Sequence, residues 1–88
     1  MTTAFLSSFL RDVKKLRDAR LRRSIEQAIL DVEKAETVEA IKSIKRLSGY
    51  QHYYRIRIGD WRIGLKMEGD VVQFVRCLHR REVYRFFP

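Results

Sequence analysis

The alternation of side-chain types between Tyr54 and Met67 is the feature that most constrains the fold. Residues 54–58 alternate aromatic or apolar side chains with cationic ones, Gly59 and Asp60 follow, and residues 61–67 alternate again. Successive side chains of a strand point to opposite faces of a sheet, and a Gly-containing pair between two such runs is typical of a hairpin turn. We therefore predict two antiparallel strands with one apolar face and one cationic face.

A third strand is predicted immediately downstream. Gly69 and Asp70 form a second turn signal, and the run Val71 to Leu78 is rich in Val and Phe and apolar at both parities. A strand that is apolar on both sides is typical of a central position covered on both faces. The three strands are expected in meander order.

The first half of the chain has helical periodicity. One apolar stripe comprises Phe9, Leu10, Val13 and Leu16, and a second runs from Leu21 to Ala35 after a charged break at residues 17–20. This spacing predicts two amphipathic helices folded back on each other, with Ser7 or Ser8 capping the first. A further short turn is expected from Thr37 to Ile41. The predicted fold class is α+β, a single domain over residues 1–88 with an N-terminal helical hairpin packed on one face of a small antiparallel sheet.

The composition narrows the possible partners. The 88 residues contain 19 Lys and Arg against 11 Asp and Glu, a net charge of +8, which favours a polyanionic partner such as nucleic acid over a role in solubility alone. Residues 1–44 contribute +2 and residues 45–88 contribute +6. No apolar run approaches the roughly 20 residues of a membrane span, and no secretory signal pattern is present, so we expect a cytoplasmic protein without a membrane partner.

Neither a metal nor another cofactor is expected from the residue types. Cys77 stands alone and so has no partner for an internal disulfide, and His52 and His79 do not supply the ligands of a structural zinc site. Cys77 lies in an apolar run, where a small buried side chain is a better interpretation than a nucleophile.

The cationic face of the hairpin is a candidate anion site. The same parity that turns the apolar residues of the two strands toward the helices turns four cations the other way, and neither predicted strand carries an acid at that parity. A solvated face usually mixes charges of both signs, so this one is better explained by phosphate binding. The four cations are Arg55, Arg57, Arg62 and Lys66.

The segment after the third strand adds further candidates. Arg81 offers the planar guanidinium that pairs with phosphate, and Tyr84 offers a ring for base stacking. His79 is a candidate for proton transfer, because histidine is the residue type that changes its charge near neutral pH. Arg80 and Arg85 extend the positive charge. A structural role is equally open for His79 and Tyr84, and for Phe86 and Phe87 packing onto the sheet is favoured.

Taken together, these motifs resemble the RelE branch of the RelE/ParE superfamily of type II toxins. The resemblance rests on two helices followed by the segments Leu47-Ser-Gly-Tyr50, Tyr54 to Ile63, and Phe74 to Tyr84, and it covers nearly the whole chain. It implies a short N-terminal strand over Thr2 to Leu6, which completes a four-stranded antiparallel sheet. It also implies an endoribonuclease that cuts messenger RNA in the ribosomal A site, contacts ribosomal RNA, and is inhibited by a cognate antitoxin protein.

The resemblance also suggests a role for each candidate. In this family the ribose 2′-hydroxyl attacks the adjacent phosphate, and cations stabilise the charge that develops. Several relatives carry a catalytic histidine at the position of His79, which makes it the leading candidate for the base, because the arginines that replace the lysines of other relatives stay protonated. The implied catalytic residues are Arg55, Arg57, Arg62, His79, Arg81 and Tyr84, and the implied substrate-binding residues are Arg55, Arg57, Lys66, Arg80 and Arg85.

Two other functions share this fold and stay open on the sequence. One is a ParE-like toxin that binds and poisons DNA gyrase without cutting RNA. The other is an RNA-binding protein or degenerate toxin without catalysis. The arginines and Tyr84 favour the nuclease, because gyrase binding gives no chemical reason to assemble them.

Overall fold

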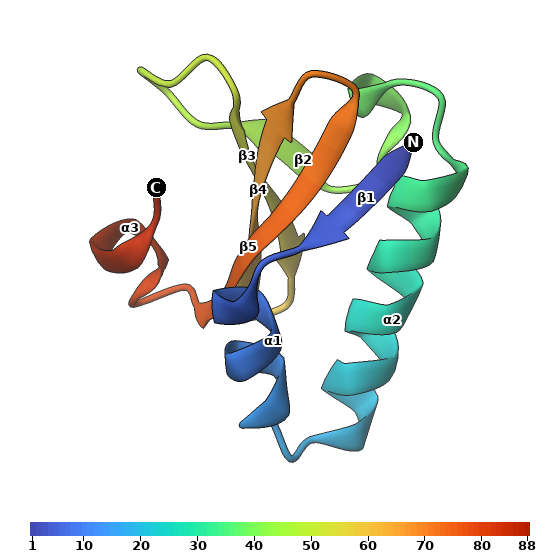
Figure 1. Ribbon diagram of the computed structural model, residues 1–88. Coiled ribbons are helices and arrows are strands. Elements are labelled where there is room, and N and C mark those ends of the chain that lie inside the picture. Colours follow the sequence, from blue (N-terminus) through green and yellow to red (C-terminus); the bar gives the residue numbers. More distant parts are fainter.

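A five-stranded sheet carries two helices on one face in the computed structural model, which describes all 88 residues (Figure 1). The strand order is β1-β5-β4-β3-β2. The α+β class and the helical hairpin on one face are confirmed. The elements in chain order are β1 (Thr2–Phe5), α1 (Ser7–Lys14), α2 (Ala19–Lys34), a 3-10 turn (Val38–Ala40), β2 (Ile44–Arg46), β3 (Tyr53–Ile58), β4 (Trp61–Glu68), β5 (Val71–His79) and α3 (Val83–Phe86).

The sheet differs from the expected one at both edges. The N-terminal strand β1 is present but pairs in parallel with β5, with Thr2 opposite Val71. No hairpin turn joins β1 to β5, because two helices and the strands β2, β3 and β4 separate them in the chain, and the two strands are therefore free to pair in parallel. At the other edge, β2 pairs antiparallel with β3. Three residues are too few to show an alternation, which is why this strand was missed.

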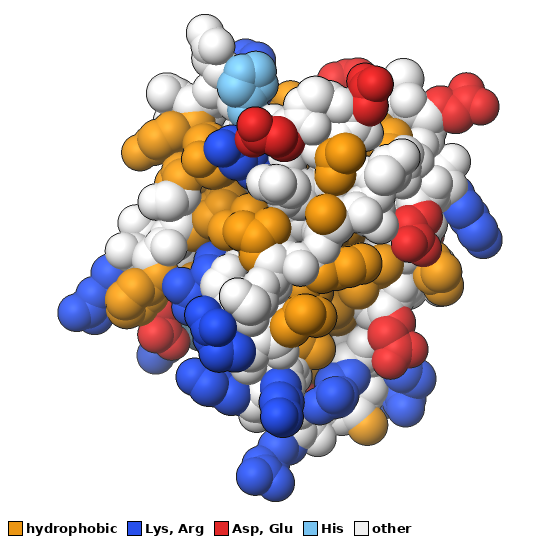
Figure 2. Space-filling model, viewed as in Figure 1, with side chains coloured by type: hydrophobic (Ala, Val, Ile, Leu, Met, Phe, Trp, Pro, Cys, Tyr) orange, Lys and Arg blue, Asp and Glu red, His pale blue; other side chains and the backbone are white.

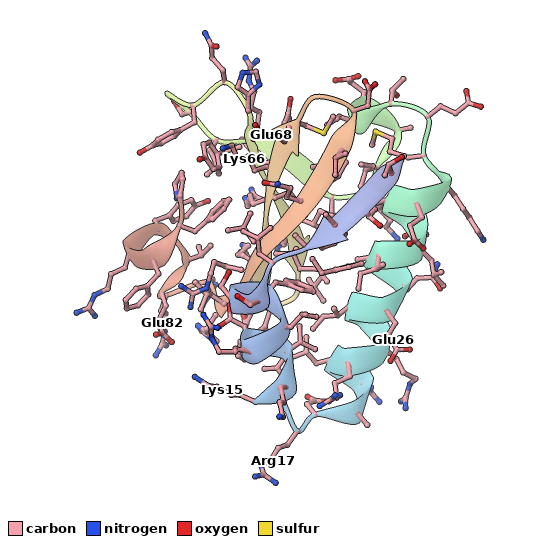
Figure 3. The ribbon with its side chains drawn as sticks, in the orientation of Figure 1. Lys15, Arg17, Glu26, Lys66, Glu68 and Glu82 are labelled. Atoms are coloured by element: carbon pink, nitrogen blue, oxygen red, sulfur yellow. The ribbon has the colours of Figure 1, made fainter.

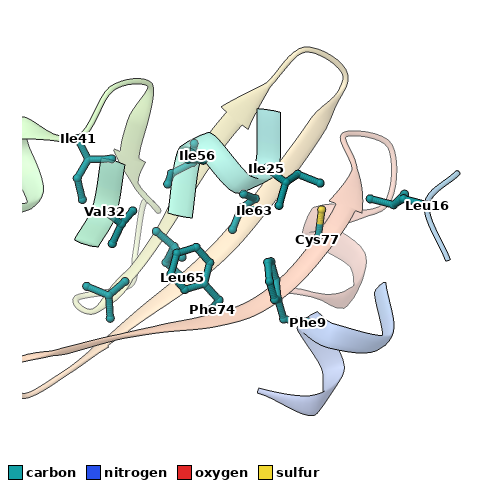
Figure 4. Packing of buried hydrophobic residues seen from close by; sticks show 12 residues of the cluster. Phe9, Leu16, Ile25, Val32, Ile41, Ile56, Ile63, Leu65, Phe74 and Cys77 are labelled. Atoms are coloured by element: carbon teal, nitrogen blue, oxygen red, sulfur yellow. The ribbon is translucent and has the colours of Figure 1, made fainter. Parts of the chain in front are cut away.

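The main core lies between the helices and the sheet (Figure 4). Phe9 and Val32 from the helices meet Ile63, Leu65 and Phe74 from the strands, and each is at most 2% exposed. The parity prediction is confirmed, because the apolar residues of β3 and β4 belong to this cluster. The first helical stripe is wrong at one residue: Leu10 is 54% exposed, because Phe9 faces the sheet and the next residue of a helix points in a different direction.

The helix ends use different residues from those expected at α1. Leu6 occupies the N-cap position without a side-chain bond, and the Ser8 hydroxyl donates instead to the carbonyl of Val75 at 2.6 Å. The predicted serine cap is therefore wrong. The break between the helices supplies a cap of its own, because the carboxylate of Asp18 accepts hydrogen bonds from the backbone N–H groups at the start of α2. The expected turn after Thr37 is present.

A smaller core covers the opposite face of the sheet, which we call the open face. It comprises Leu47, Leu78, Val83 and Phe87, so β5 is covered on both sides as predicted. Gly64 of β4 makes this packing possible: a Cβ atom there would lie 2.8 Å from the ring of Phe87. The packing prediction is confirmed for Phe87 and wrong for Phe86, which is 49% exposed. No helix of the chain has both the length and the apolar character needed to cross a bilayer.

Candidate functional site

Three arginines converge on the open face near the β3–β4 turn. Arg57 and Arg62 are direct cross-strand partners, and Arg55, two residues back on β3, lies opposite Gly64. Gly64 has no side chain, and the ring of Phe87 packs over it beside Arg55. We refer to Arg55, Arg57 and Arg62 as the arginine cluster.

The charges of the arginine cluster repel one another. Burial lowers the pKa of Arg62, and the positive charges of Arg55 and Arg57 lower it further. The guanidinium is positioned by its own turn, because Nη1 donates to the carbonyls of Gly59 at 2.8 Å and Trp61 at 2.9 Å. None of the three arginines forms an ion pair with a carboxylate. Like charges held together without an acid are suited to binding an anion.

A hollow of about 380 Å³ opens beside the cluster. Tyr50 and Tyr84 are its exposed aromatic residues, 49% and 64% accessible respectively, and no acid lines it. A negative charge on Tyr84 would raise the pKa of Arg62, so the hydroxyl lies within electrostatic reach of the cluster. Rings beside uncompensated cations are suited to a nucleotide. The lining residues are Lys45, Arg46, Leu47, Ser48, Tyr50, Arg55, Tyr84, Phe87 and Pro88.

Two cations and one ring of this hollow were missed by sequence reasoning. Lys45 pairs in register with Arg55, and Arg46 and Tyr50 follow it along the chain. Their membership depends on β2, which the sequence does not reveal. The motif Leu47 to Tyr50 was available as a signal, although it was used only as part of a family pattern.

Lys66 lies on the open face but is held by an acid. Its Nζ is 3.1 Å from the Glu68 carboxylate and 5.6 Å from the centre of the Tyr53 ring (Figure 3). The hydrogen bond that Nζ donates to the Glu68 carboxylate is the main reason that the pKa of Lys66 is raised. The expectation that this parity carries no acid is therefore wrong, because β4 extends one residue past Met67 and places Glu68 beside Lys66.

His79 is not brought together with the arginine cluster. It is the cross-strand partner of Trp61, and the two rings meet edge to face at 5.5 Å on the helix-bearing side of the sheet. Its Nδ1 accepts a hydrogen bond from the backbone N–H of Arg81 at 3.2 Å. The next residue back, Leu78, is the partner of Arg62. Alternation along β5 thus directs the imidazole away from the face that carries the cluster, which separates it from the role of base suggested above.

The arginines of the C-terminal segment divide among different neighbours. The Arg80 side chain pairs loosely with Asp60 at 3.7 Å, and its charge also lowers the pKa of Arg62. Arg81 is exposed and its side chain forms no hydrogen bond or ion pair. Arg85 places its guanidinium 5.5 Å from the centre of the Phe86 ring. Of these three, Arg80 is the one that the structure associates with the cluster.

Cys77 and the neighbouring Asp12 have structural roles. Burial raises the pKa of the Cys77 thiol to about 12, and the charge of Asp12 adds to the shift. The Asp12 carboxylate accepts from the Arg76 guanidinium at 2.7 Å and from the Cys77 backbone N–H at 2.9 Å. The interpretation of Cys77 as a buried small side chain is confirmed. Nowhere do three His, Cys, Asp or Glu side chains gather in a way that could hold a metal ion.

The fold is that of the small RelE toxins. The chain superposes on the crystal structure of the RelB-RelE antitoxin-toxin complex from Methanococcus jannaschii with a TM-score of 0.80 at 34% identity, covering 96% of this chain and 98% of that one. An archaeal RelE-RelB complex from Pyrococcus horikoshii and the YoeB dimer from Staphylococcus aureus each give a TM-score of 0.71. Their identities of 18% and 17% support the shared fold alone. They cover 93% and 90% of this chain, and 97% and 95% of their own chains.

The sequence comparisons give the family. The family described as ParE toxin of type II toxin-antitoxin system, parDE, matches residues 4–84. Toxin RelE3 of Methanocaldococcus jannaschii is 36% identical over the full length of both chains. The chain therefore belongs to the RelE/ParE superfamily of type II toxin-antitoxin toxins, and its full-length relative is of the RelE kind.

Proposed function

We propose that this toxin is an endoribonuclease that cuts messenger RNA in the ribosomal A site and so inhibits translation. The observation that carries the proposal is the arginine cluster, which holds three uncompensated positive charges beside a hollow flanked by Tyr50 and Tyr84. Phosphate supplies the negative charge that this site lacks, and nucleobases supply planar partners for the rings.

In the proposed reaction the O2′ atom of a ribose attacks the adjacent phosphorus. The bond from phosphorus to O5′ breaks, which leaves a 2′,3′-cyclic phosphate on one fragment and a 5′-hydroxyl on the other. The 2′-hydroxyl proton is released to solvent, and O5′ takes up a proton as it leaves. Negative charge builds on the phosphoryl oxygens in between, where Arg55, Arg57 and Arg62 are proposed to stabilise it without a metal.

The other candidate residues are assigned supporting parts. Tyr84 is proposed to stack on a base and orient the ribose, while Arg80 and Arg81 bind phosphates that flank the cut. Lys66 on the open face and Arg85 on α3 are proposed to add to the general attraction for RNA. His79 is assigned to positioning, because its Nδ1 atom holds the backbone of Arg81.

A cognate antitoxin is the proposed inhibitor. The solved toxins of M. jannaschii and P. horikoshii are each bound to a RelB partner. A net charge of +8 favours an acidic partner segment, which would compete with RNA if it covered the open face. A segment that orders on binding is well suited to such a surface.

The gyrase-poisoning alternative keeps one specific point in its favour, since the matching family carries the ParE description. The two functions differ in what the arginine cluster is for. A nuclease needs the cluster for chemistry, whereas a gyrase ligand needs only a complementary surface. The 36% identity to Toxin RelE3 over the full length of both chains favours the nuclease.

The deciding experiment uses purified protein on translating ribosomes. Primer extension should show new 5′ ends within the codon of the A site, and Arg62→Ala should abolish most of them. Lys34→Ala, a change of equal charge on an exposed residue in the last turn of α2, should not. Gyrase supercoiling assays run in parallel. Intact messenger together with trapped gyrase-DNA breaks would overturn the nuclease and establish the alternative.

A further inference from the structure

The connection between α1 and α2 carries a second concentration of positive charge. Residues 11–23, which we call the helical tip, hold seven cations and two acids, a net charge of +5, whereas residues 24–44 hold two cations and five acids, a net charge of −3. A sum over residues 1–44 hides this division because the two parts nearly cancel. The seven cations are Arg11, Lys14, Lys15, Arg17, Arg20, Arg22 and Arg23.

The charges of the helical tip are not neutralised within the chain. All seven cations are exposed, and none takes part in an ion pair. Its two acids are already occupied, Asp12 by Arg76 and Asp18 by the backbone N–H groups that it caps. Figure 2 shows Lys and Arg gathered at the end of the molecule where the helices join, and Figure 3 shows Arg17 extending outward from that end.

The helical tip adjoins the arginine cluster through the β3–β4 turn. A shallow hollow is lined by Asp18, Arg20 and Leu21 from the tip and by Gly59 and Asp60 from the turn. The carbonyl of Gly59 also accepts the hydrogen bond that positions Arg62. The β3–β4 turn thus adjoins both the arginine cluster and the helical tip, and the acids Asp18 and Asp60 lie between the two cationic surfaces.

The surface chemistry of the tip fits a nucleic acid better than a protein. Residues 11–23 expose no large apolar side chain, since the exposed ones lie elsewhere, as Leu10 and Leu30 do. Protein interfaces have an apolar, aromatic-rich centre, while nucleic-acid interfaces are polar and strongly cationic. Five of the seven cations are arginines, which pair with phosphate through two parallel hydrogen bonds.

We propose that the helical tip is a second binding surface for the phosphate backbone of structured RNA. It anchors the toxin while the arginine cluster engages the strand to be cut. The identity of that RNA as ribosomal rests on the proposed function. The anchor itself does no chemistry, so its loss should weaken binding and leave the cleavage step unchanged once substrate is saturating.

The test compares two double variants of equal charge on the full chain. Arg17→Gln with Arg20→Gln removes two cations from the tip without touching the Asp18 cap, which uses only the backbone at residue 20. Lys34→Gln with Lys42→Gln removes two exposed cations outside it. Binding to vacant ribosomes is measured as a function of salt, so that no cleavage takes place. The tip variant should bind on the order of tenfold more weakly, with a log-log salt slope smaller by about 2, while the control keeps the slope of the unmodified protein.

Two results would overturn this inference. In the first, the tip and control variants bind ribosomes equally. In the second, the tip variant loses as much affinity for polyglutamate as for ribosomes and for a synthetic RNA duplex, which would assign the tip to an acidic protein. Failure of the proposed function looks different: messenger would stay intact with the unmodified protein while the tip variant still lost ribosome affinity.

Discussion

The two faces of the sheet differ in how much apolar material covers them. The helix-bearing face supports a cluster of 12 buried residues, and the open face supports a cluster of four. Every member of the arginine cluster lies on the open face, next to the smaller of the two cores. Stability and the candidate chemistry are therefore assigned to opposite sides of the same strands, and β4 contributes to both through alternate residues.

This division explains how one short chain tolerates a repulsive site. Burial and neighbouring positive charges lower the pKa of Arg62, so the cluster opposes its own assembly. The larger core on the other face holds the strands in register regardless, which keeps the arginines in position before an anion arrives. Such preorganisation is where an electrostatic site gains its effect.

The most direct test of the difference between the two faces is to damage the larger core alone. Phe74→Ala removes a fully buried ring that contacts Phe5 and Phe9. We expect the free energy of unfolding to fall by about 3–5 kcal/mol in urea titrations. Leu78→Ala in the smaller core, where the residue is 9% exposed, should cost less. An equal cost for the two would mean that the faces contribute alike.

Removing one charge from the open face should slow cleavage without lowering stability. Arg62→Ala is expected to slow single-turnover cleavage by roughly 10²–10³-fold, equivalent to about 2.7–4 kcal/mol in the activation barrier. The melting temperature should stay the same or rise, because a source of repulsion is lost. A cleavage rate that falls only in step with stability would assign Arg62 to the fold.

Gly64→Ala tests the point where the two faces meet. The added methyl group would overlap the ring of Phe87, so we expect a loss of about 1–3 kcal/mol in unfolding free energy from overpacking. Cleavage should also slow, because Phe87 supports the segment that carries Tyr84. Combining Gly64→Ala with Phe87→Leu should recover part of the stability, and a strictly additive double variant would show that the two residues do not contact.

Cys77, which is buried in the larger core, should make the free energy of unfolding depend on pH. The thiol pKa of Cys77 is about 12 in the folded protein and near 9 when exposed, so above pH 9 the unfolded state loses its proton first. Stability should therefore be fully present below pH 9 and fall as the pH rises toward 12, by about 1.4 kcal/mol per unit. Urea titrations of both proteins at each pH should show that Cys77→Ala loses less stability between pH 9 and pH 12 than the unmodified protein does. An equal loss of stability in the two proteins would contradict this prediction.

The smallest expected effect is at His79. Because its ring lies on the helix-bearing side, His79→Ala should leave the pH profile of single-turnover cleavage unchanged between about pH 6 and 7. Loss of the hydrogen bond to Arg81 should cost about 0.5–1.5 kcal/mol in stability. A flattened pH profile would restore His79 as the base and require the C-terminal segment to rearrange on substrate binding.

Much of the fold could be predicted because its strongest signals are local. The hairpin turn at Gly59 and Asp60 needs only neighbouring residues, and so does the alternation that separates Ile63 from Arg62. The edges of the sheet are different. The pairing of β1 with β5 joins residues about seventy positions apart, and β2 has no pattern of its own.

The residues of the candidate site that alternate along a strand could be predicted from the sequence. Those that reach the site through tertiary packing could not. The three arginines were identified because parity alone puts them together. His79 was grouped with them by its place in the sequence, although the same parity rule, applied through β5, separates it. Lys45 has no local signal, and the motif that contains Tyr50 does not by itself show that the loop after β2 lies beside Arg55.

The carboxylate of Asp12 has a mechanical consequence. It joins α1 to β5 by accepting from both the Arg76 side chain and the Cys77 backbone, next to the irregularity in the β4–β5 ladder. That bond spans sixty-four positions of sequence and clamps the helical hairpin to the strand that ends beside the β3–β4 turn. This contact therefore limits how far the helical tip can move relative to the arginine cluster. An RNA that engages both surfaces must therefore present phosphates at a spacing that matches the distance between them.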